Sequence, residues 1–279
     1  MTKVITLSQA ADIVKNGDMV ALGGNVLHRA PMAMVRELVR KGRKGLKIVK
    51  TAGAIDVDML CFGKCVDSVD AGFISYETEF GLATHYRRSV ENGMVKANEH
   101  ACYTVICALR ASMMGVPFMP VKGLKAGDLL KFADYYKIIQ DPFGGEKITV
   151  VRALVPDVAV IHVQESDKYG NARILGPKYE DILLSRASKK VIVTAENIVS
   201  QTKVCAGGAE NIDIPHFLVT AVVHAPGGAA PCSCPSFYDI DRKAVETFKA
   251  LEDEDALTRY LSVWERKDRR GGNGKAVSI

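Results

Sequence analysis

DMVALGGNVLHRAPMAMVRELVR, residues 18–40, is the stretch that decides the fold. The apolar run at 19–22 has the length of a strand, and Gly23 and Gly24 break it, because glycine tolerates the backbone angles of a sharp turn. Pro31 suits the first turn of a helix, where its missing N–H costs nothing. The positions that follow form one apolar stripe at helical spacing, Val35, Leu38 and Val39. The stretch therefore predicts strand, glycine turn and helix.

The same turn is a candidate ligand site. A glycine turn that opens onto a helix N-terminus presents free N–H groups and the positive end of the helix dipole. Arg29, just before the helix, adds a planar cation. Such a place can hold a phosphate, a carboxylate or a developing oxyanion. The alternative is an ordinary α/β turn without a ligand, and the pattern is not the GxGxxG of dinucleotide-binding proteins.

Length and composition set wide limits. The 279 residues fit one large α/β domain or two small ones, and 48% apolar and 25% charged residues supply a real core. The net charge of +5 is mild, and no basic stripe interleaved with aromatics indicates nucleic-acid binding. A small anionic ligand fits this mild charge equally well.

Targeting signals are not evident. The first residues, MTKVITLSQAADIVKNGD, are too polar for a signal peptide, and no apolar run is long enough to span a bilayer. We therefore expect a cytoplasmic protein without a membrane partner. Seven cysteines at irregular spacings are then best interpreted as reduced thiols, mostly buried.

Strand and helix patterns alternate along the chain. Strands are predicted at 19–22, 46–49, 67–75, 158–163, 190–194 and 218–223, and helices at 8–16, 57–62, 84–92, 99–114, 179–187, 242–251 and 255–267. Residues 118–147 are irregular and glycine-rich, which indicates an excursion or flap. The alternation predicts one α/β domain over 1–270, with an open, mostly parallel sheet and helices on both faces, followed by a disordered tail at 271–279.

Ligands of such folds gather at the carboxyl ends of strands. Four predicted turns fall there: Gly23-Gly24-Asn25, Ala52-Gly53-Ala54, the segment 76–79, and the loop 164–174. In the last of these, Gly170 and Asn171 could place backbone N–H groups and an amide beside a ligand. An ordinary β-turn is the alternative.

Three glutamates are candidates for chemistry. Glu77 and Glu79 follow a buried strand, and a glutamate at a strand end could act as a nucleophile toward a thioester or as a general base. Glu99 is predicted to open the helix at 99–114, where a glutamate usually only stabilises the helix dipole.

Metal and thiol chemistry are weakly indicated. Cys232 and Cys234 form a C-x-C without a second pair nearby, and the six histidines are scattered. We assign no metal, and no cysteine has a local activating signature. Arg87 and Arg88 are interpreted as a solvated or subunit-facing surface, with CoA phosphate contact as the alternative.

Five blocks, in order, resemble the α subunits of family I CoA-transferases, most closely those of the glutaconate CoA-transferase type. They are GGNVLHRAPMAMVREL from Gly23, FISYETEFGLATHYRRSVENG at 73–93, ALRASMMGVPFMPVKGLKAGDLL from Ala108, DPFGGEKITVVRALVPDVAVIHVQESDKYGNARILG from Asp141, and VVHAPGGAAP from Val222. The fourth block is the most specific, because PDVAVIHV followed by D-x-x-GN is hard to reach by chance. Together the blocks reach nearly to residue 239.

The resemblance implies a fold and a reaction. It implies the CoA-transferase (NagB/RpiA-like) α/β fold and an enzyme that moves CoA from an acyl-CoA to a carboxylic acid by ping-pong. The intermediate would be a glutamyl-CoA thioester on a separate β subunit, and CoA would be a substrate, with no resident cofactor. On this chain, the residues carried over to substrate or CoA binding are Gly23, Gly24, Asn25, Arg29, Glu77, Gly170 and Asn171.

Two other readings stay open. The resemblance extends to a ring-opening hydrolase of steroid breakdown, which acts on a cyclic CoA thioester with an α-subunit glutamate as base. That glutamate aligns with Glu99, in KANEH. The other reading is an effector-binding protein that kept the fold without the activity.

Overall fold

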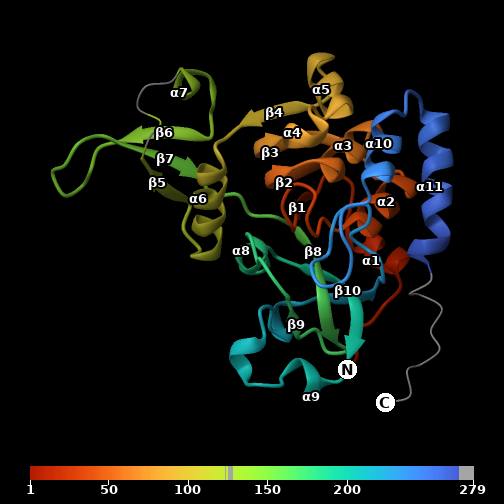
Figure 1. The fold of residues 1–279 in the computed structure, drawn as a ribbon. Coiled ribbons are helices and arrows are strands. Elements are labelled where there is room, and N and C mark those ends of the chain that lie inside the picture. Colours follow the sequence, from red (N-terminus) through yellow and green to blue (C-terminus); the bar gives the residue numbers. More distant parts are fainter. Residues whose placement is uncertain (123, 125–127, 270–279) are drawn as a thin grey trace.

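The computed structural model describes residues 1–122, 124 and 128–269, and the predicted tail lies outside these residues. Its main sheet has eight strands, of which seven are parallel and follow the order β11-β10-β8-β1-β2-β3-β4 (Figure 1). The parallel strands are β1 (Met19–Leu22), β2 (Leu46–Gly53), β3 (Val66–Ile74), β4 (Lys96–Glu99), β8 (Val158–Asp167), β10 (Val191–Val199) and β11 (Ala221–His224). The eighth, β9 (Ala172–Arg173), runs antiparallel to β8. The predicted mostly parallel α/β sheet is confirmed.

Helices cover both faces of the sheet because its central strands are apolar on both sides. In β1, Val20 and Leu22 join the core beneath one layer of helices, whereas Ala21 joins the core on the other side. The first layer contains α1 (Leu7–Ile13), α2 (Met32–Arg40), α3 (Ile55–Phe62), α10 (Arg242–Lys249) and α11 (Glu254–Asp268), with α5 (Thr84–Glu91) against α3. The second contains α6 (Cys102–Met113) and α8 (Asp181–Ala187).

The C-terminal helix is fastened to α2 by a buried ion pair. Asp268 accepts hydrogen bonds from Arg36 at 2.5 and 2.8 Å and from Arg40 at 2.7 Å. The Arg36 guanidinium also lies 4.4 Å from the centre of the Trp264 ring. Arg36 also donates to the Ala230 carbonyl at 2.6 Å, so three of the five N–H groups of this fully buried guanidinium have acceptors.

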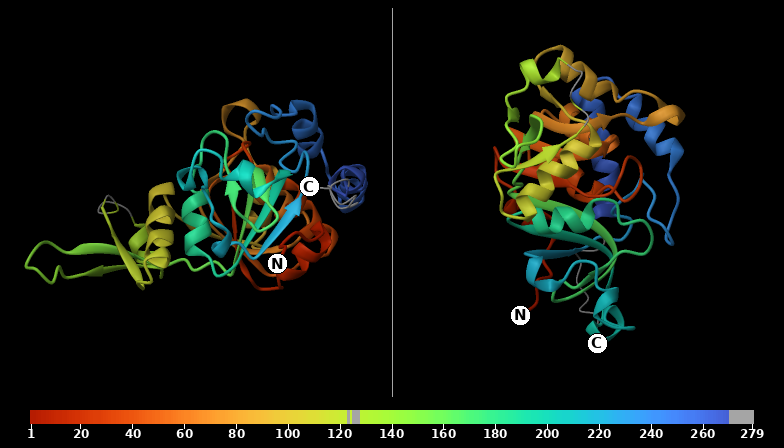
Figure 2. Two further views of the ribbon diagram at one scale, coloured as in Figure 1. Left: turned by 90° about the horizontal axis from the view of Figure 1, so that it is seen from below. Right: turned by 90° about the vertical axis from the view of Figure 1, so that its left-hand side faces the viewer.

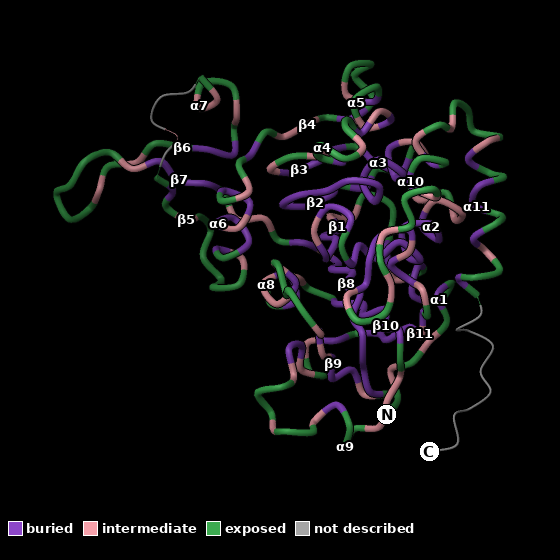
Figure 3. Tube along the Cα trace, in the orientation of Figure 1, coloured by how far each residue is buried: buried purple, intermediate pink, exposed green. Residues whose placement is uncertain are grey.

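The excursion predicted at 118–147 has regular structure of its own. It forms an antiparallel sheet of β5 (Phe118–Val121), β7 (Ile148–Arg152) and β6 (Tyr136–Ile139), with the one-turn helix α7 (Leu129–Phe132). This small sheet projects from the body (Figures 1 and 2), and it is buried only near its base, where it packs on α6 (Figure 3). Its entry and exit meet, since the Ala153 N–H donates to the Pro117 carbonyl at 2.9 Å.

The remaining described helices are short: α4 (Glu77–Phe80), α9 (Gln201–Val204) and two 3₁₀ turns at Ala209–Asn211 and His216–Leu218. No helix in the described part of the chain has the length and apolar character to cross a membrane. All seven cysteines are free, and all but Cys102 and Cys205 are buried.

Two predicted elements were wrong in detail. The helix predicted at 99–114 is an edge strand, β4, followed by α6, so Glu99 ends a strand and does not begin a helix. The sequence Lys96–Glu99 does not indicate a strand, because an edge strand buries few side chains and therefore needs no apolar run. At the N-terminus, Thr6 and not Ser8 caps α1, through a capping box with Gln9.

Candidate active site at the carboxyl edge of the sheet

Three neighbouring strands bring most of the predicted residues to one edge. The loop after β1 crosses the end of β2, where the Val26 N–H donates to the Ala52 carbonyl at 3.0 Å. The end of β2 is tied in turn to the end of β3, where the Ser75 N–H donates to the Gly53 carbonyl at 2.9 Å. The glycine turn, the small residues after β2 and Glu77 are therefore parts of one edge, as expected for parallel strands.

The glycine turn is needed for close packing. A β-carbon on Gly23 would lie 2.6 Å from Asp181 Oδ1, and one on Gly24 would lie 2.4 Å from the His28 carbonyl oxygen. Gly24 also has a φ of +72° and donates its N–H to Asp181 Oδ1 at 2.8 Å. Asn25 and His28 then exchange two backbone hydrogen bonds, which closes the turn. Only the side chains of Asn25 and His28 reach the surface here.

The N–H groups that were expected to be free, at the two glycines and at the start of α2, have partners within the protein, so that prediction was wrong. The Gly23 N–H donates to the Val160 carbonyl, and at the start of α2 the N–H of Ala33 donates to the Gly228 carbonyl. The loop at Gly228 therefore covers the helix N-terminus. Sequence reasoning could not find this cover, because it comes from a segment almost 200 residues further along the chain.

Arg29 lies inside the protein. Its side chain is fully buried and forms an ion pair with Asp181 at 2.7 Å. It also donates to the carbonyls of His162 and Pro177, at 2.8 and 2.7 Å, and lies over the ring of Tyr179. Arg29 thus joins the glycine turn to β8 and to the start of α8. Its proposed contact with CoA or an acyl group stays a prediction.

Next to the glycine turn lies a cluster of polar side chains that was not predicted from the sequence. The Thr51 hydroxyl donates to Glu180 Oε2 at 2.8 Å, and the Cys102 thiol donates to the Thr51 carbonyl at 3.3 Å. Cys102 is the first residue of α6, and burial together with the nearby Glu180 carboxylate raises the pKa of its thiol. Lys50 is buried beside them and pairs with Asp56 at 3.0 Å. No local pattern marks these residues, since three separate segments supply them.

Glu77 follows β3 at the same edge and has a strained backbone. Its φ is +57°, which is uncommon for a residue with a side chain. The side chain is exposed, whereas the preceding Tyr76 is buried and donates its hydroxyl to Asp58 at 2.9 Å. Burial raises the pKa of Asp58 to about 6, although hydrogen bonds from Tyr86 and Tyr76 oppose the shift.

Glu99 is the last residue of the edge strand β4, which runs parallel to β3 and ends at the same edge of the sheet. It is exposed and borders a cavity of about 460 Å³ between β4 and α7, which Phe132 and Tyr135 also line. Beneath it, the side chain of His100 lies 3.2 Å from Asp70 Oδ1 and 3.0 Å from the Tyr136 hydroxyl. This buried chain of contacts fastens the projecting sheet to the main sheet.

Gly170 and Asn171 lie away from the glycine turn. β8 continues seven residues past Val160, the partner of Leu22, so Asp167 lies roughly 20 Å further along the strand. There Asp167 Oδ1 accepts the N–H groups of Gly170 and Asn171, and Asn171 donates its amide to Asp167 Oδ2. Asn171 Oδ1 accepts from the N–H of His216. The turn is held by its own contacts, and its ligand role stays a prediction.

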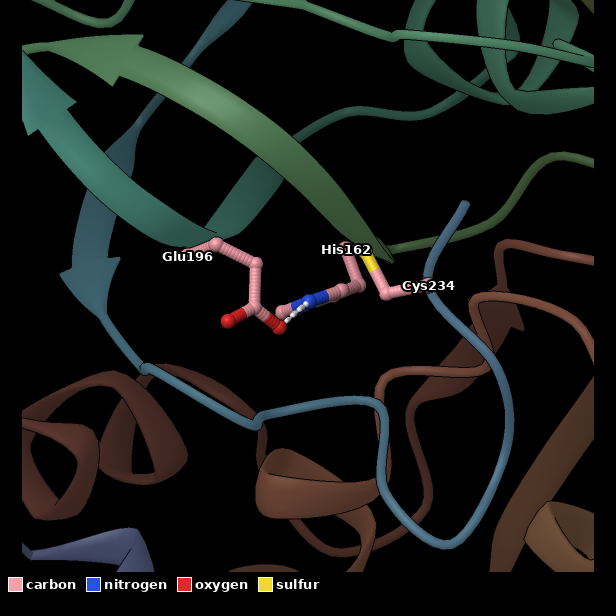
Figure 4. Close-up of side chains that lie close together, drawn as sticks. All are labelled: His162, Glu196 and Cys234. Atoms are coloured by element: carbon pink, nitrogen blue, oxygen red, sulfur yellow. Dashed lines mark hydrogen bonds and ion pairs between the residues drawn. The ribbon is translucent and has the colours of Figure 1, made fainter. Parts of the chain in front are cut away.

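One buried cluster has the donor types of a metal site: His162, Glu196 and Cys234, whose ligand atoms lie within 4.8 Å of one another (Figure 4). Every nitrogen and carboxylate oxygen in it already has a partner. His162 contacts Thr194 at 2.9 Å and Glu196 at 2.8 Å, and Glu196 also accepts from Tyr238 and from the Gly227 N–H.

The cost of ionising the Cys234 thiol also disfavours a cation in this cluster. Burial and the nearby Glu196 raise the pKa of the Cys234 thiol to about 12. Burial alone would raise the pKa of Glu196, but its hydrogen bonds with His162 and Tyr238 lower it overall. A cation would have to break the His162–Glu196 hydrogen bond and ionise the thiol. We interpret the cluster as a polar brace for the Gly227–Gly228 loop.

Sequence comparison places these features among known proteins. The family model of Coenzyme A transferase matches residues 4–225. The A subunit of glutaconate CoA-transferase from Acidaminococcus fermentans is 32% identical, over 96% of this chain and 90% of that protein. An uncharacterized protein of Archaeoglobus fulgidus is 38% identical, and the chain spans only 62% of its length. A cholesterol ring-cleaving hydrolase IpdA subunit of Rhodococcus jostii is 27% identical, over 86% of this chain and 84% of that protein.

Solved structures agree with the sequence matches. The crystal structure of glutaconate coenzyme A-transferase from Acidaminococcus fermentans superposes with a TM-score of 0.85 at 30% identity, over 95% of this chain and 93% of that one. A single-residue variant of the decarboxylase AibA/AibB gives a TM-score of 0.83 at 28% identity, over 94% of this chain and all of that one.

Proposed function

The chain belongs to the coenzyme A transferase family, and from this premise we propose that it is the α subunit of an enzyme that moves CoA from an acyl-CoA to a carboxylic acid. One observation carries the proposal. The A chain of a named CoA-transferase matches 96% of this chain over 90% of its own length, so the similarity extends over nearly the whole chain. CoA is then a substrate, and no resident cofactor takes part.

The reaction would be ping-pong, through a glutamyl-CoA thioester on a β-subunit partner. This chain would supply one wall of a shared cleft, with Asn25 and Glu77 as the predicted residues whose side chains reach the surface. Gly23, Gly24 and Arg29 would act indirectly, because their contacts fix the position of that wall.

A second candidate is hydrolysis or ring opening of a CoA thioester, with Glu99 as general base. The observation that favours it is the exposed Glu99 beside an open cavity, in a chain 27% identical to a ring-cleaving hydrolase subunit. A general base must reach the attacking water, and an exposed carboxylate at a strand end can do so.

The test uses the complex purified through a tag on this chain. We would incubate it with acetyl-CoA, glutaryl-CoA and benzoyl-CoA, and measure the intact mass of each subunit. A CoA adduct on the partner, with CoA appearing on an added acid, would establish the transferase. Thioester consumption without transfer, abolished by Glu99→Gln, would establish the hydrolase. No partner and no turnover would refute both and favour an effector-binding role.

A further inference from the structure

A groove of about 490 Å³ lies between α10 and α11, which belong to the same helix layer (Figure 1). The rings of Phe248 and Tyr260 join the two helices, with their centres 5.6 Å apart. Both walls carry an alanine, Ala244 on α10 and Ala256 on α11, and such short side chains leave the space between the helices open. The groove has the size of a site for a small molecule.

The groove has an apolar, aromatic floor. Tyr260 and Trp264 line it and are only 7% and 6% exposed, and the Arg36 guanidinium, 4.4 Å from the Trp264 ring, fixes that ring in place. Leu251 and Val263 add aliphatic surface, and Val263 is 67% exposed. A concave apolar surface of this kind favours the apolar part of a ligand, because binding removes both from water.

Three cations surround this apolar surface: Lys243 on α10, and Arg259 and Lys267 on α11. The side chains of Lys243 and Arg259 make no hydrogen bond or ion pair with any residue that the structure describes. The Lys267 ammonium lies 4.5 Å from the centre of the Trp264 ring, at the wall of the groove. Asp241 also lines the groove, but its carboxylate caps α10 and accepts a backbone N–H of that helix at 3.0 Å. The groove is therefore positively charged.

The acidic residues of α11 leave these cations uncompensated. In the second half of the helix, Glu265 pairs with Arg269 at 2.6 Å, and Asp268 is bound by the two arginines of α2. In the first half, Asp255 lies one turn before Arg259, but the two form no ion pair in the described part of the chain. An anion in the groove would supply the missing countercharge.

An apolar groove with cations at its rim is complementary to a molecule that combines an apolar body with an anionic group. An arginine suits a carboxylate in particular, because its planar fork matches the two oxygens. We propose that the groove between α10 and α11 binds a small carboxylate with an apolar body, at a site separate from the carboxyl edge. The inference goes beyond the proposed function, because the groove is built from residues 241–267 and none of them is assigned to CoA transfer.

The test is equilibrium dialysis of the full chain, in the complex in which it is purified, against 2-naphthoate. Two matched compounds separate the contributions: 2-naphthamide has the same rings without the charge, and acetate has the charge without the rings. We expect saturable binding of naphthoate that weakens as salt is added, since the cations are exposed. Naphthamide should bind at least about tenfold more weakly, because it cannot form charge-assisted hydrogen bonds, and acetate should not saturate the site.

Variants of α11 locate the bound naphthoate. Val263→Asp places a carboxylate among the three cations and should weaken binding by about tenfold or more, through like-charge repulsion. Arg259→Ala should weaken it by about threefold to tenfold, because one charge-assisted contact is lost. Both positions are exposed, so the melting temperature should stay that of the wild type. Arg266→Ala is the matched control, an exposed arginine of the same helix that does not line the groove, and should leave the affinity unchanged.

Three results would overturn the inference. Naphthoate that does not saturate, or that binds no better than naphthamide, would show that the cations recognise no anion. The same affinity in the wild type and Val263→Asp would place the bound naphthoate elsewhere, such as the carboxyl edge. Loss of the partner subunit from the Val263→Asp complex would mean that the groove is covered by that subunit. The proposed transferase would stand in each case, because CoA transfer is measured separately.

Discussion

The guanidinium of Arg29 and the carboxylate of Asp181 lie 2.7 Å apart, with side chains 0% and 1% exposed. Breaking a buried pair from one side leaves an uncompensated charge, which costs about 3–5 kcal/mol. We therefore expect Arg29→Met to lower the free energy of unfolding by that amount in urea titrations. Arg87→Met is the control, because its pair with Glu91 is exposed on both sides and contributes about 0.5 kcal/mol or less.

The same experiment separates two roles for Arg29. If Arg29→Met unfolds at the same urea concentration as the wild type and loses only activity, Arg29 is chiefly a ligand-binding residue. The contacts of its buried guanidinium would then contribute less to the free energy of unfolding than we expect.

The glycine turn gives a second prediction. Gly24→Ala should be more destabilising than Gly17→Ala by about 1–3 kcal/mol, the usual cost of forcing extra atoms into a packed site. Both glycines have positive φ, +72° and +84°, so the strain is similar in the two variants. Only at Gly24 would the new β-carbon meet the backbone, 2.4 Å from the His28 carbonyl oxygen. Equal denaturation midpoints would refute the close approach.

Asp58 predicts a dependence of stability on pH. Its pKa is about 6 in the fold and 3.8 for an unperturbed aspartate, so the folded chain binds the proton more tightly than the unfolded chain. Its contribution to the free energy of unfolding is greatest below pH 3.8, falls as the pH rises through 6, and is flat above.

Asp58→Asn should remove this dependence. The stability of the wild type relative to Asp58→Asn should therefore increase by about 2 kcal/mol between about pH 7.5 and about pH 4.5. Other titrating groups largely cancel in the difference. His85 works in the opposite direction, since burial and Arg88 lower its pKa to about 4. A difference that stays constant over this range would contradict the assignment.

The C-terminal helix supplies a fourth prediction. Asp268→Asn weakens the contacts with both Arg36 and Arg40 and should cost about 3–5 kcal/mol, because Arg36 keeps its charge inside the protein. Glu265→Gln breaks the exposed pair with Arg269 one turn earlier and should cost less than about 0.5 kcal/mol. Thermal unfolding and the rate of proteolysis within residues 241–269 would show the contrast. Equal effects would mean that α11 is held by apolar packing alone.

Local patterns were enough to predict the fold class. The strand at 19–22 and the helix after Pro31 lie where the sequence predicts them, because the apolar spacing and the turn residues agree there. The edge strand β4 was missed, since four residues with no apolar run at an edge carry little signal. Such a strand forms because it pairs with a distant segment, and that pairing cannot be predicted from the strand's own residues.

The candidate site was predictable only as a location. The rule that parallel strands bring their carboxyl ends together correctly grouped the glycine turn with Glu77. It could not reveal that Arg29 is neutralised by Asp181, which lies more than 150 residues away in the chain. The same holds for Thr51, Glu180 and Cys102, whose contacts join three separate segments.

The hydrogen bond between Ala153 and Pro117 has a consequence for how such a chain can change over evolutionary time. A segment whose two ends meet behaves as a cassette, because lengthening, shortening or exchanging it leaves the flanking backbone almost where it was. The main sheet would need no redesign to accept a different projection. We therefore expect amino-acid changes to concentrate in the part of the small sheet that lies farther from the main sheet than Tyr135 and Tyr136. These two residues anchor the cassette on His100 and α6. New assemblies would then arise around an unaltered carboxyl edge.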